Sequence, residues 1–303
     1  MLALMTLPDL DELLGLRGLA QGLAARLRRP VQALSWGGHN SPHRGRGLEF
    51  QEVRPYVAGD DPRTIDWRVT ARRGRPHTKL FREERERPVW LVVDLNPALF
   101  FGTRRQLKSA AIVRAAALLA WVAGLGGDRV GAVVHDGSAL RIVAPRPREA
   151  GVLAVLAALL ELQPRAPGRP RPQSLEAAVG ALVPLARPGS LLVALSDFAG
   201  LGATADAAWG TLSSHSAWRL LWICDALEEQ ALPNGRFRVG LPESVRILDG
   251  AGVRACWLEA WRMRRQRVES LAAALAAPLT RLDTHAAVEE ALGQALGRQR
   301  ALA

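Results

Sequence analysis

Residues Val89–Asp94 read Val-Trp-Leu-Val-Val-Asp, a continuous apolar run that ends in an acidic residue. A short uninterrupted run of this kind is typical of a strand that is buried on both faces of a parallel sheet. Two similar runs follow, Ser190–Ser196 before Asp197 and Trp218–Cys224 before Asp225. Because helical patterns alternate with these runs, the sequence predicts an α/β fold with a mostly parallel sheet covered by helices.

The pattern between and around these runs predicts the remaining elements. Helices are predicted over Pro8–Arg29, Leu107–Val122, Ala150–Leu162, Ser174–Leu185, Arg254–Ala277 and Ala286–Arg298. Further strands are predicted over Arg129–His135, Ala139–Val143 and Leu279–Leu282. The dipeptide Asp136-Gly137 favours a hairpin turn between the first two of these strands.

The segment Gly37–Arg87 differs in composition from the rest of the chain. Glycine and charged residues dominate it, and its apolar residues come in short pieces, which indicates a small strand-and-loop module. We therefore predict two domains. Residues 1–87 hold the first helix and this module, and residues 88–303 form the α/β domain.

The composition narrows the classes of function. The chain has a formal charge of +11, but its arginines are scattered among acids rather than gathered in a stripe with aromatic residues. We therefore expect no nucleic-acid partner, although a basic nucleic-acid-associated protein stays open as a hypothesis that salt-sensitive retention of DNA or RNA would support. Two distant cysteines, Cys224 and Cys256, suit a reducing compartment. With no signal-peptide pattern and no membrane span expected, we predict a cytoplasmic location.

The acids that end the predicted strands point to one edge of the sheet, where ligands bind in open α/β folds. The stretch Val92–Ala98 resembles the Asp-x-Ser-x-Ser motif that opens the metal-ion-dependent adhesion site of von Willebrand A domains. Ser174 is similar to the threonine of that site, and Asp197 to its closing aspartate. The resemblance implies a von Willebrand A-like fold and an Mg²⁺ held by Asp94, Asn96, Ser174 and Asp197.

The sequence departs from that motif at its two serine positions. Asn96 stands at the first and still offers an amide oxygen, whereas Ala98 stands at the second and offers none. Mg²⁺ demands near-ideal octahedral geometry, so a missing oxygen matters. Two interpretations stay open: a degenerate site that binds Mg²⁺, or a vestigial site in which Asp94 makes structural hydrogen bonds.

A longer and more specific pattern lies upstream. It comprises Gly45–Phe50 (GRGLEF), Arg54–Tyr56 (RPY), Gly59–Trp67 (GDDPRTIDW) and Thr70–Arg72 (TAR). This pattern resembles the signature of the domain-of-unknown-function family numbered fifty-eight, whose members join such a segment to a von Willebrand A-like domain. Relatives are commonly encoded beside MoxR-type AAA+ ATPases. The resemblance therefore implies an adaptor for such an ATPase in chaperone-like assembly, maturation or metal insertion.

Charges of alternating sign make this upstream segment a candidate binding surface. Because arginine pairs bidentately with carboxylates, the residues can form an internal ion-paired clasp or a docking face for a partner, and both readings stay open. The candidate residues are Glu49, Arg54, Tyr56, Asp60, Asp61, Arg63, Asp66, Trp67 and Arg72.

Templates for catalysis are largely missing from the sequence. It contains neither a Gly-x-Ser-x-Gly elbow nor a Walker A motif. We therefore predict a non-catalytic protein-interaction protein. The alternative is a metal-dependent hydrolase that uses Asp94 and Asp197 at the strand-end edge.

Overall fold

The computed structural model describes residues 6–27, 48–57, 60–83, 87–171, 174–201 and 207–298. The chain divides into two compact units, which are described separately. The larger unit takes residues 1–37 and 87–303, and the smaller unit takes residues 38–86.

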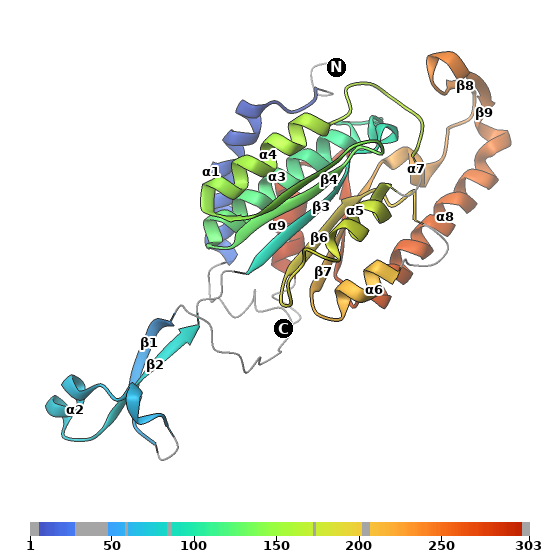
Figure 1. Ribbon diagram of the computed structural model, residues 1–303. Helices are drawn as coiled ribbons and strands as arrows, with labels where there is room; N and C mark the ends of the chain where they lie inside the picture. The colour runs from blue at the N-terminus through green and yellow to red at the C-terminus, as the bar shows by residue number, and fades with distance from the viewer. Residues whose placement is uncertain are drawn as a thin grey trace. The chain divides into compact units, whose positions relative to one another are not determined.

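The larger unit is built on one six-stranded sheet (Figure 1). From edge to edge the strands are β5 (Leu140–Pro147), β4 (Arg129–His135), β3 (Pro88–Asp94), β6 (Leu191–Ser196), β7 (Ala217–Cys224) and β10 (Leu279–Asp283). Only β5 runs antiparallel to its neighbour. Counted along the chain from β3, the order is 3-2-1-4-5-6, that of a doubly wound fold. The predicted α/β class with a mostly parallel sheet is confirmed.

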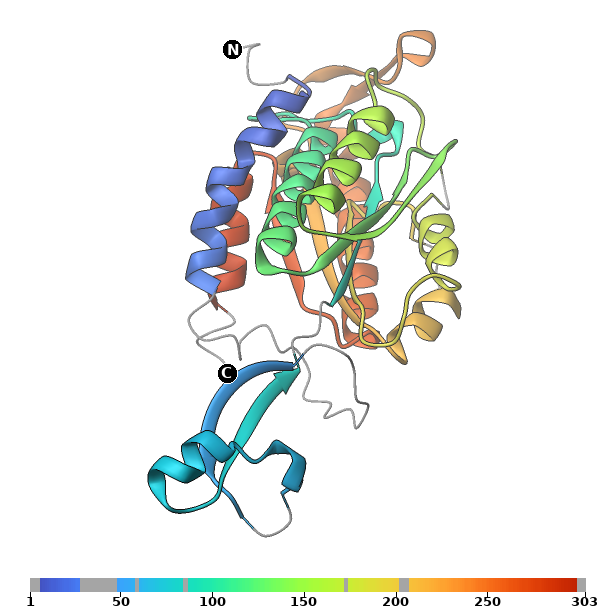
Figure 2. The same ribbon diagram turned by 60° about the vertical axis from the view of Figure 1, so that its left-hand side comes forward.

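Helices cover both faces of this sheet (Figures 1 and 2). One layer holds α1 (Leu10–Leu27), α3 (Lys108–Gly126), α4 (Arg148–Leu162) and α9 (Val288–Arg298). The other holds α5 (Ser174–Leu182), α6 (Ala207–Ser213) and α8 (Gly250–Ala274). The sheet therefore lies between two hydrophobic cores.

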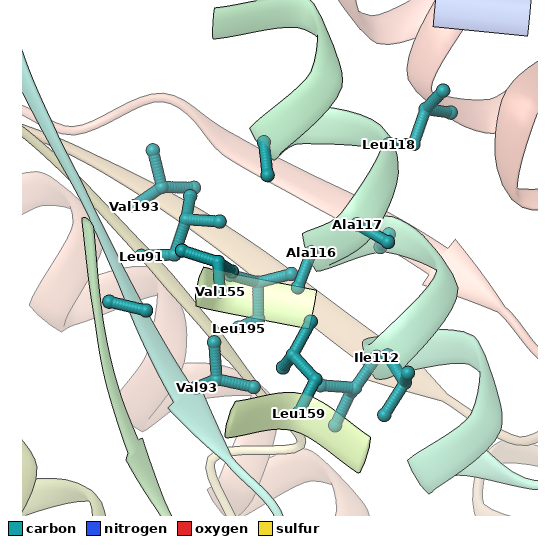
Figure 3. Packing of buried hydrophobic residues seen from close by; sticks show 14 of the residues in the cluster. Leu91, Val93, Ile112, Ala116, Ala117, Leu118, Val155, Leu159, Val193 and Leu195 are labelled. Atoms are coloured by element: carbon teal, nitrogen blue, oxygen red, sulfur yellow. The ribbon is translucent and has the colours of Figure 1, made fainter. Parts of the chain in front are cut away.

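The run that predicted the fold supplies both cores, because successive side chains of a strand point to opposite faces. Leu91 and Val93 enter the core under α3 and α4, whereas Trp90 and Val92 enter the core on the other face. Figure 3 shows Leu91 and Val93 of β3 packed toward Ile112 of α3. All four strand residues are at most 3% exposed, which explains why the run contains no polar residue.

Helix α3 is the central helix of the first core. Of the described helices it is the one long and apolar enough to cross a bilayer by length and composition, and 67% of that stretch is buried inside the structure. The core helix of a globular unit meets the same criterion, so the packing of α3 is enough to explain its apolar composition.

The structure divides the chain differently from the predicted split at residue 87, because α1 belongs to the larger unit. Leu13 and Ala20 of α1 are fully buried in the core against α3. The indole Nε1–H of Trp121 donates to the backbone oxygen of Leu13 at 3.0 Å, and Arg114 pairs with Glu12. The leucine face of α1 is buried mainly by packing on α3, with further contacts to α4 and α9, which places this helix with the sheet.

The smaller unit is a hairpin with an inserted helix. Strand β1 (Leu48–Pro55) pairs antiparallel with β2 (His77–Glu83), and between them lie the 3₁₀ turn η2 (Pro62–Thr64) and α2 (Trp67–Arg73). The sequence predicted strands and loops here, because glycine and charged residues dominate the segment and its apolar residues come in short pieces. That prediction missed α2.

A few further short elements were not predicted. They are η3 (Pro97–Leu99), α7 (Ala226–Gln230), η4 (Pro242–Ser244) and the antiparallel hairpin β8 (Arg236–Val239) with β9 (Arg246–Asp249), together with α6. All lie in connections of the larger unit, so they leave the order of the main sheet unchanged.

The assignment of α1 to the larger unit gives a direct prediction. Leu13→Ala should lower the free energy of unfolding by about 2–5 kcal/mol, because the leucine is fully buried and its removal leaves a cavity. Leu19→Ala on the same helix is the control: this side chain is 45% exposed and should change stability by no more than about 0.5 kcal/mol. Urea unfolding measures both, and equal effects would contradict the packing.

Candidate functional site

Two of the predicted metal-site residues lie at the carboxyl ends of two neighbouring strands in the middle of the sheet. Asp94 ends β3, and Asp197 follows β6, the neighbouring parallel strand. The strand order reverses between these strands, which is where ligands bind in such sheets. Asn96 follows β3 within two residues, and Ser174 is the first residue of α5. We call this region the strand-end site.

The Asp94 carboxylate is buried and bonded within the chain. Its Oδ1 accepts from the backbone N–H of Asn96 at 3.0 Å, and its Oδ2 accepts from Ser196 Oγ at 2.8 Å. Ser196 Oγ in turn accepts from the backbone N–H of Phe198 at 2.9 Å. Asp94 therefore holds together the chain segments that leave β3 and β6.

The amide of Asn96 is directed to backbone groups. Its Oδ1 accepts from the N–H groups of Ala98 and Arg171, both at 3.2 Å, and its Nδ2 donates to the Arg171 backbone oxygen at 2.7 Å. The side chain thereby caps η3 and ties it to the loop before α5. Ala98 next to it has no side-chain oxygen.

The third predicted ligand, Asp197, is held by a lysine that the sequence analysis did not select. Lys108 Nζ lies 2.7 Å from Asp197 Oδ2 and 2.8 Å from Glu228 Oε1. The lysine side chain is only 3% exposed. Glu228 also accepts from Arg264 at 2.7 Å. We call Lys108, Asp197, Glu228 and Arg264 the Lys108 cluster.

Both charges of the central pair are stabilised in the folded protein. Burial by itself lowers the pKa of Lys108 and raises the pKa of Asp197. Their mutual attraction, with Glu228 acting on the lysine, outweighs burial, so the pKa of Lys108 is raised and that of Asp197 is lowered. The pair therefore exists as ammonium and carboxylate.

A neighbouring acid, Asp225, extends this arrangement to the end of β7. Its carboxylate accepts from the hydroxyl of Thr103, from Thr284 Oγ1 at 2.6 Å and from the N–H of Leu227 at 3.0 Å. Asp225 N–H donates to Glu228 Oε2 at 3.0 Å, completing a capping box that begins α7. These hydrogen bonds lower the pKa of Asp225 against the opposing effect of burial.

Sequence reasoning missed Lys108 although the sequence carries a signal for it. The chain has only two lysines among its many arginines, and Lys108 is the first residue of an apolar helix. A cation is disfavoured at the positive end of a helix dipole. A lone lysine there indicates a nearby acid, but it does not say which one.

The geometry does not fit a von Willebrand A-type Mg²⁺ site. Asp197 is engaged by the Lys108 ammonium, Asn96 Oδ1 already accepts two N–H groups, and Ala98 lacks an oxygen. Within the described residues, no three side chains of histidine, cysteine, aspartate or glutamate gather in a way that could hold a metal ion. A cationic group already lies against Asp197, one of the two acids that the resemblance assigns to the metal.

The candidate residues of the smaller unit take three different roles. Arg54 Nη2 pairs with Asp60 Oδ1 at 2.8 Å, and this contact lowers the pKa of Asp60. Tyr56 OH donates to the Asp60 backbone oxygen at 3.3 Å. These three residues close one turn after β1, as a clasp would. Glu49 lies on β1.

The other two aspartates begin helical turns. Asp61 Oδ1 accepts from the N–H of Arg63 at 2.9 Å and starts η2. Asp66 Oδ1 accepts from the N–H groups of Arg68 and Val69 at 3.0 and 3.1 Å and is the N-cap of α2. Capping by such carboxylates stabilises helix ends.

The remaining candidates, Arg63, Trp67 and Arg72, are exposed. Trp67 is 69% exposed, and neither arginine forms an ion pair within the part of the chain that the structure describes. The alternating charges therefore do not form one network around both aromatic residues. Part of the segment is a clasp, and part is open surface.

The Lys108 cluster gives a stability prediction. Lys108→Met removes the ammonium while keeping much of the stem, which leaves Asp197 and Glu228 as buried carboxylates without their shared partner. We expect the free energy of unfolding near neutral pH to fall by about 3–5 kcal/mol in urea unfolding. Arg262→Met, which breaks an exposed pair with Glu259, is the control and should change it by less than about 1 kcal/mol.

The same variant should respond to pH. Without the ammonium, the effect of burial on Asp197 is no longer offset by Lys108, so we expect its pKa to rise and the variant to regain stability as the pH falls toward about 5. In the wild type the pKa of Asp197 is lowered from 3.8, so its contribution is complete above that value and is lost as the pH falls through the lower folded value. A difference in the free energy of unfolding between wild type and variant that stays constant from neutral pH to about 5 would contradict this account.

Metal binding is tested separately. Titration of Mg²⁺ or Mn²⁺ into the metal-stripped protein should give no saturable heat in calorimetry, because Lys108 neutralises Asp197 and the Asn96 oxygen is engaged. Asp94→Ala serves as the comparison. Saturable binding that disappears in Asp94→Ala would overturn the prediction.

The chain resembles known proteins both in sequence and in structure. An uncharacterized protein of Mycobacterium tuberculosis (strain ATCC 25618 / H37Rv) is 34% identical over 178 residues. That match covers 59% of this chain and 56% of the relative, so it spans little more than half of the relative's length.

Among solved structures, the conserved hypothetical protein BatB from Bacteroides thetaiotaomicron aligns with a TM-score of 0.46 at 11% identity, covering 71% of this chain and 99% of that one. A von Willebrand factor type A protein from Catenulispora acidiphila aligns with a TM-score of 0.39 at 12% identity, covering 74% and 44%. The family described as "Protein of unknown function DUF58" matches residues 52–250, which include the strand-end site and the charged segment from Arg54 to Arg72. The chain belongs to this family.

Proposed function

We propose that the protein is a non-catalytic interaction protein that works with a MoxR-type AAA+ ATPase in chaperone-like assembly or maturation of other proteins. One observation carries the first part of the proposal: the acids of the strand-end site are bound by donors of the chain itself. Asp94, Asp197, Asp225 and Glu228 each accept hydrogen bonds from side chains or backbone groups.

This arrangement favours a scaffold over a catalytic site. A general base or a nucleophilic carboxylate needs a lone pair directed at its substrate, and its pKa is tuned toward the working pH. Here the pKa values of Asp197 and Asp225 are instead lowered by their partners. The alternative hydrolase, using Asp94 and Asp197, would have to displace Lys108 before the second acid became available.

The partner named in the proposal rests on the resemblance of the charged segment to that of proteins encoded beside such ATPases. The exposed arginines and Trp67 of the smaller unit support a docking role, because arginine and tryptophan are enriched among residues that dominate binding energy. In the larger unit the strand-end acids Asp94 and Asp197 are buried and held by donors of the chain, so the proposal assigns docking to the smaller unit.

The test uses the full chain and the MoxR-type ATPase of the same organism. Calorimetry or biolayer interferometry, with and without ATP, should give saturable binding. In parallel, the purified chain should not turn over p-nitrophenyl phosphate or a generic peptide in the presence of Mg²⁺.

Two outcomes would overturn the proposal. Turnover that is abolished by Asp94→Ala would identify the hydrolase instead. Absence of binding by correctly folded protein, judged by its unfolding transition, would remove the ATPase as the partner.

A further inference from the structure

The outer face of α2 carries the most exposed large apolar side chain among the described residues. Trp67, Arg68, Ala71 and Arg72 fall on one side of the helix at its 3.6-residue period, and all four are exposed. Trp67 is 69% exposed. We call these four residues the Trp67 face.

The Trp67 face is presented by a helix that is fixed at both ends and along its inner side. Asp66 caps its first turn. Gly74, with φ +69°, ends it in the left-handed conformation that glycine favours. On the inner side, Thr70 Oγ1 accepts from the N–H of His77 on β2 at 3.0 Å. A short helix held in this way presents its outer side chains without having to order on binding.

The surroundings of the Trp67 face are positively charged. Between residues 61 and 75 the chain carries five arginines and two aspartates, and both aspartates serve as caps. Arg63, Arg68 and Arg72 form no ion pair within the described ranges. Their charges are therefore available to a partner.

We propose that the Trp67 face binds an acidic segment of a protein partner. An apolar side chain of the partner packs on the Trp67 ring, and flanking carboxylates pair with Arg68 and Arg72. This inference rests on the proposed function, since it names the chemistry by which the docking module recognises its partner. Tryptophan next to arginine is the composition of a binding hot spot, and the charges add specificity and speed of association.

An acidic protein fits this face better than a nucleic acid does. Single-stranded nucleic acids are bound by several aromatic side chains on which successive bases stack, along a groove that follows the phosphates. This face has one aromatic residue on a seven-residue helix, with the exposed carboxylate of Asp61 close by in the sequence. A short acidic peptide segment can bind to a face of this size, because it does not require a groove lined by several aromatic side chains.

The experiment measures binding of a fluorescein-labelled peptide of glutamates around a central pair of leucines, by fluorescence anisotropy with the full chain. Saturable binding is expected, and added sodium chloride should weaken it because exposed charges are screened. Trp67→Ala and the double variant Arg68→Glu/Arg72→Glu should each weaken it by about tenfold or more, the loss typical of a hot spot.

Matched controls separate this face from general basicity. Arg236→Glu/Arg238→Glu makes the same change in charge at exposed positions of β8, and Ile247→Ala truncates a side chain that is 62% exposed. Both should leave the affinity unchanged. Equal losses in the controls would overturn the proposal, as would tighter binding of an oligothymidylate of the same charge, which would assign the face to nucleic acid.

Two further measurements keep the result interpretable. The Tm of the free protein should not change in Trp67→Ala, and a lower Tm would show that the chain itself covers this side chain, against the proposal. The same variants are then tested against the ATPase. ATPase binding that is insensitive to both variants would overturn this inference and leave the proposed function standing. Binding of the peptide without any binding of the ATPase would overturn the proposed function and leave this inference standing.

Discussion

The buried ammonium of Lys108 is the interaction on which the strand-end edge depends. It joins the first residue of α3 to the segment after β6 and to α7, partners that lie 89 and 120 residues away in the sequence. In a water-poor interior two carboxylates this close repel each other strongly, and a single cation between them turns that repulsion into attraction. Asp197, one of the residues to which the von Willebrand A resemblance assigns a divalent ion, is therefore held here by a side-chain cation of the chain itself.

The main sheet could be predicted from the sequence because its signals are local. The apolar run Val89–Asp94 has the length and composition of a doubly buried strand, and Asp136-Gly137 marks the hairpin between β4 and β5. The pairing of Lys108 with Asp197 could not be predicted in the same way, since it depends on how distant strand ends meet. The cofactor and the partner stay predictions.

The charged segment shows why a pattern of alternating charge does not specify a structure by itself. Arginine and aspartate can pair with each other, but an aspartate can also cap a helix through its own neighbouring N–H groups. Asp60 takes the first course with Arg54, whereas Asp66 takes the second and begins α2. Asp66 caps α2 through two neighbouring N–H groups, and Arg63, Arg68 and Arg72 stay exposed close to it in the sequence.

The placement of α1 with the larger unit has a consequence for biosynthesis. The α/β unit consists of two stretches of chain, and the whole smaller unit is inserted between them. During translation the hairpin of β1 and β2 is complete before β3 emerges, so the smaller unit can fold while α1 still lacks its binding surface. The leucine face of α1 must then stay exposed until α3 is made. The last strand of the sheet is added later still, when the hydroxyl of Thr284 can donate to Asp225. Because its contacts with α3 span the whole smaller unit, the apolar face of α1 stays exposed during synthesis for longer than that of a helix with a local partner.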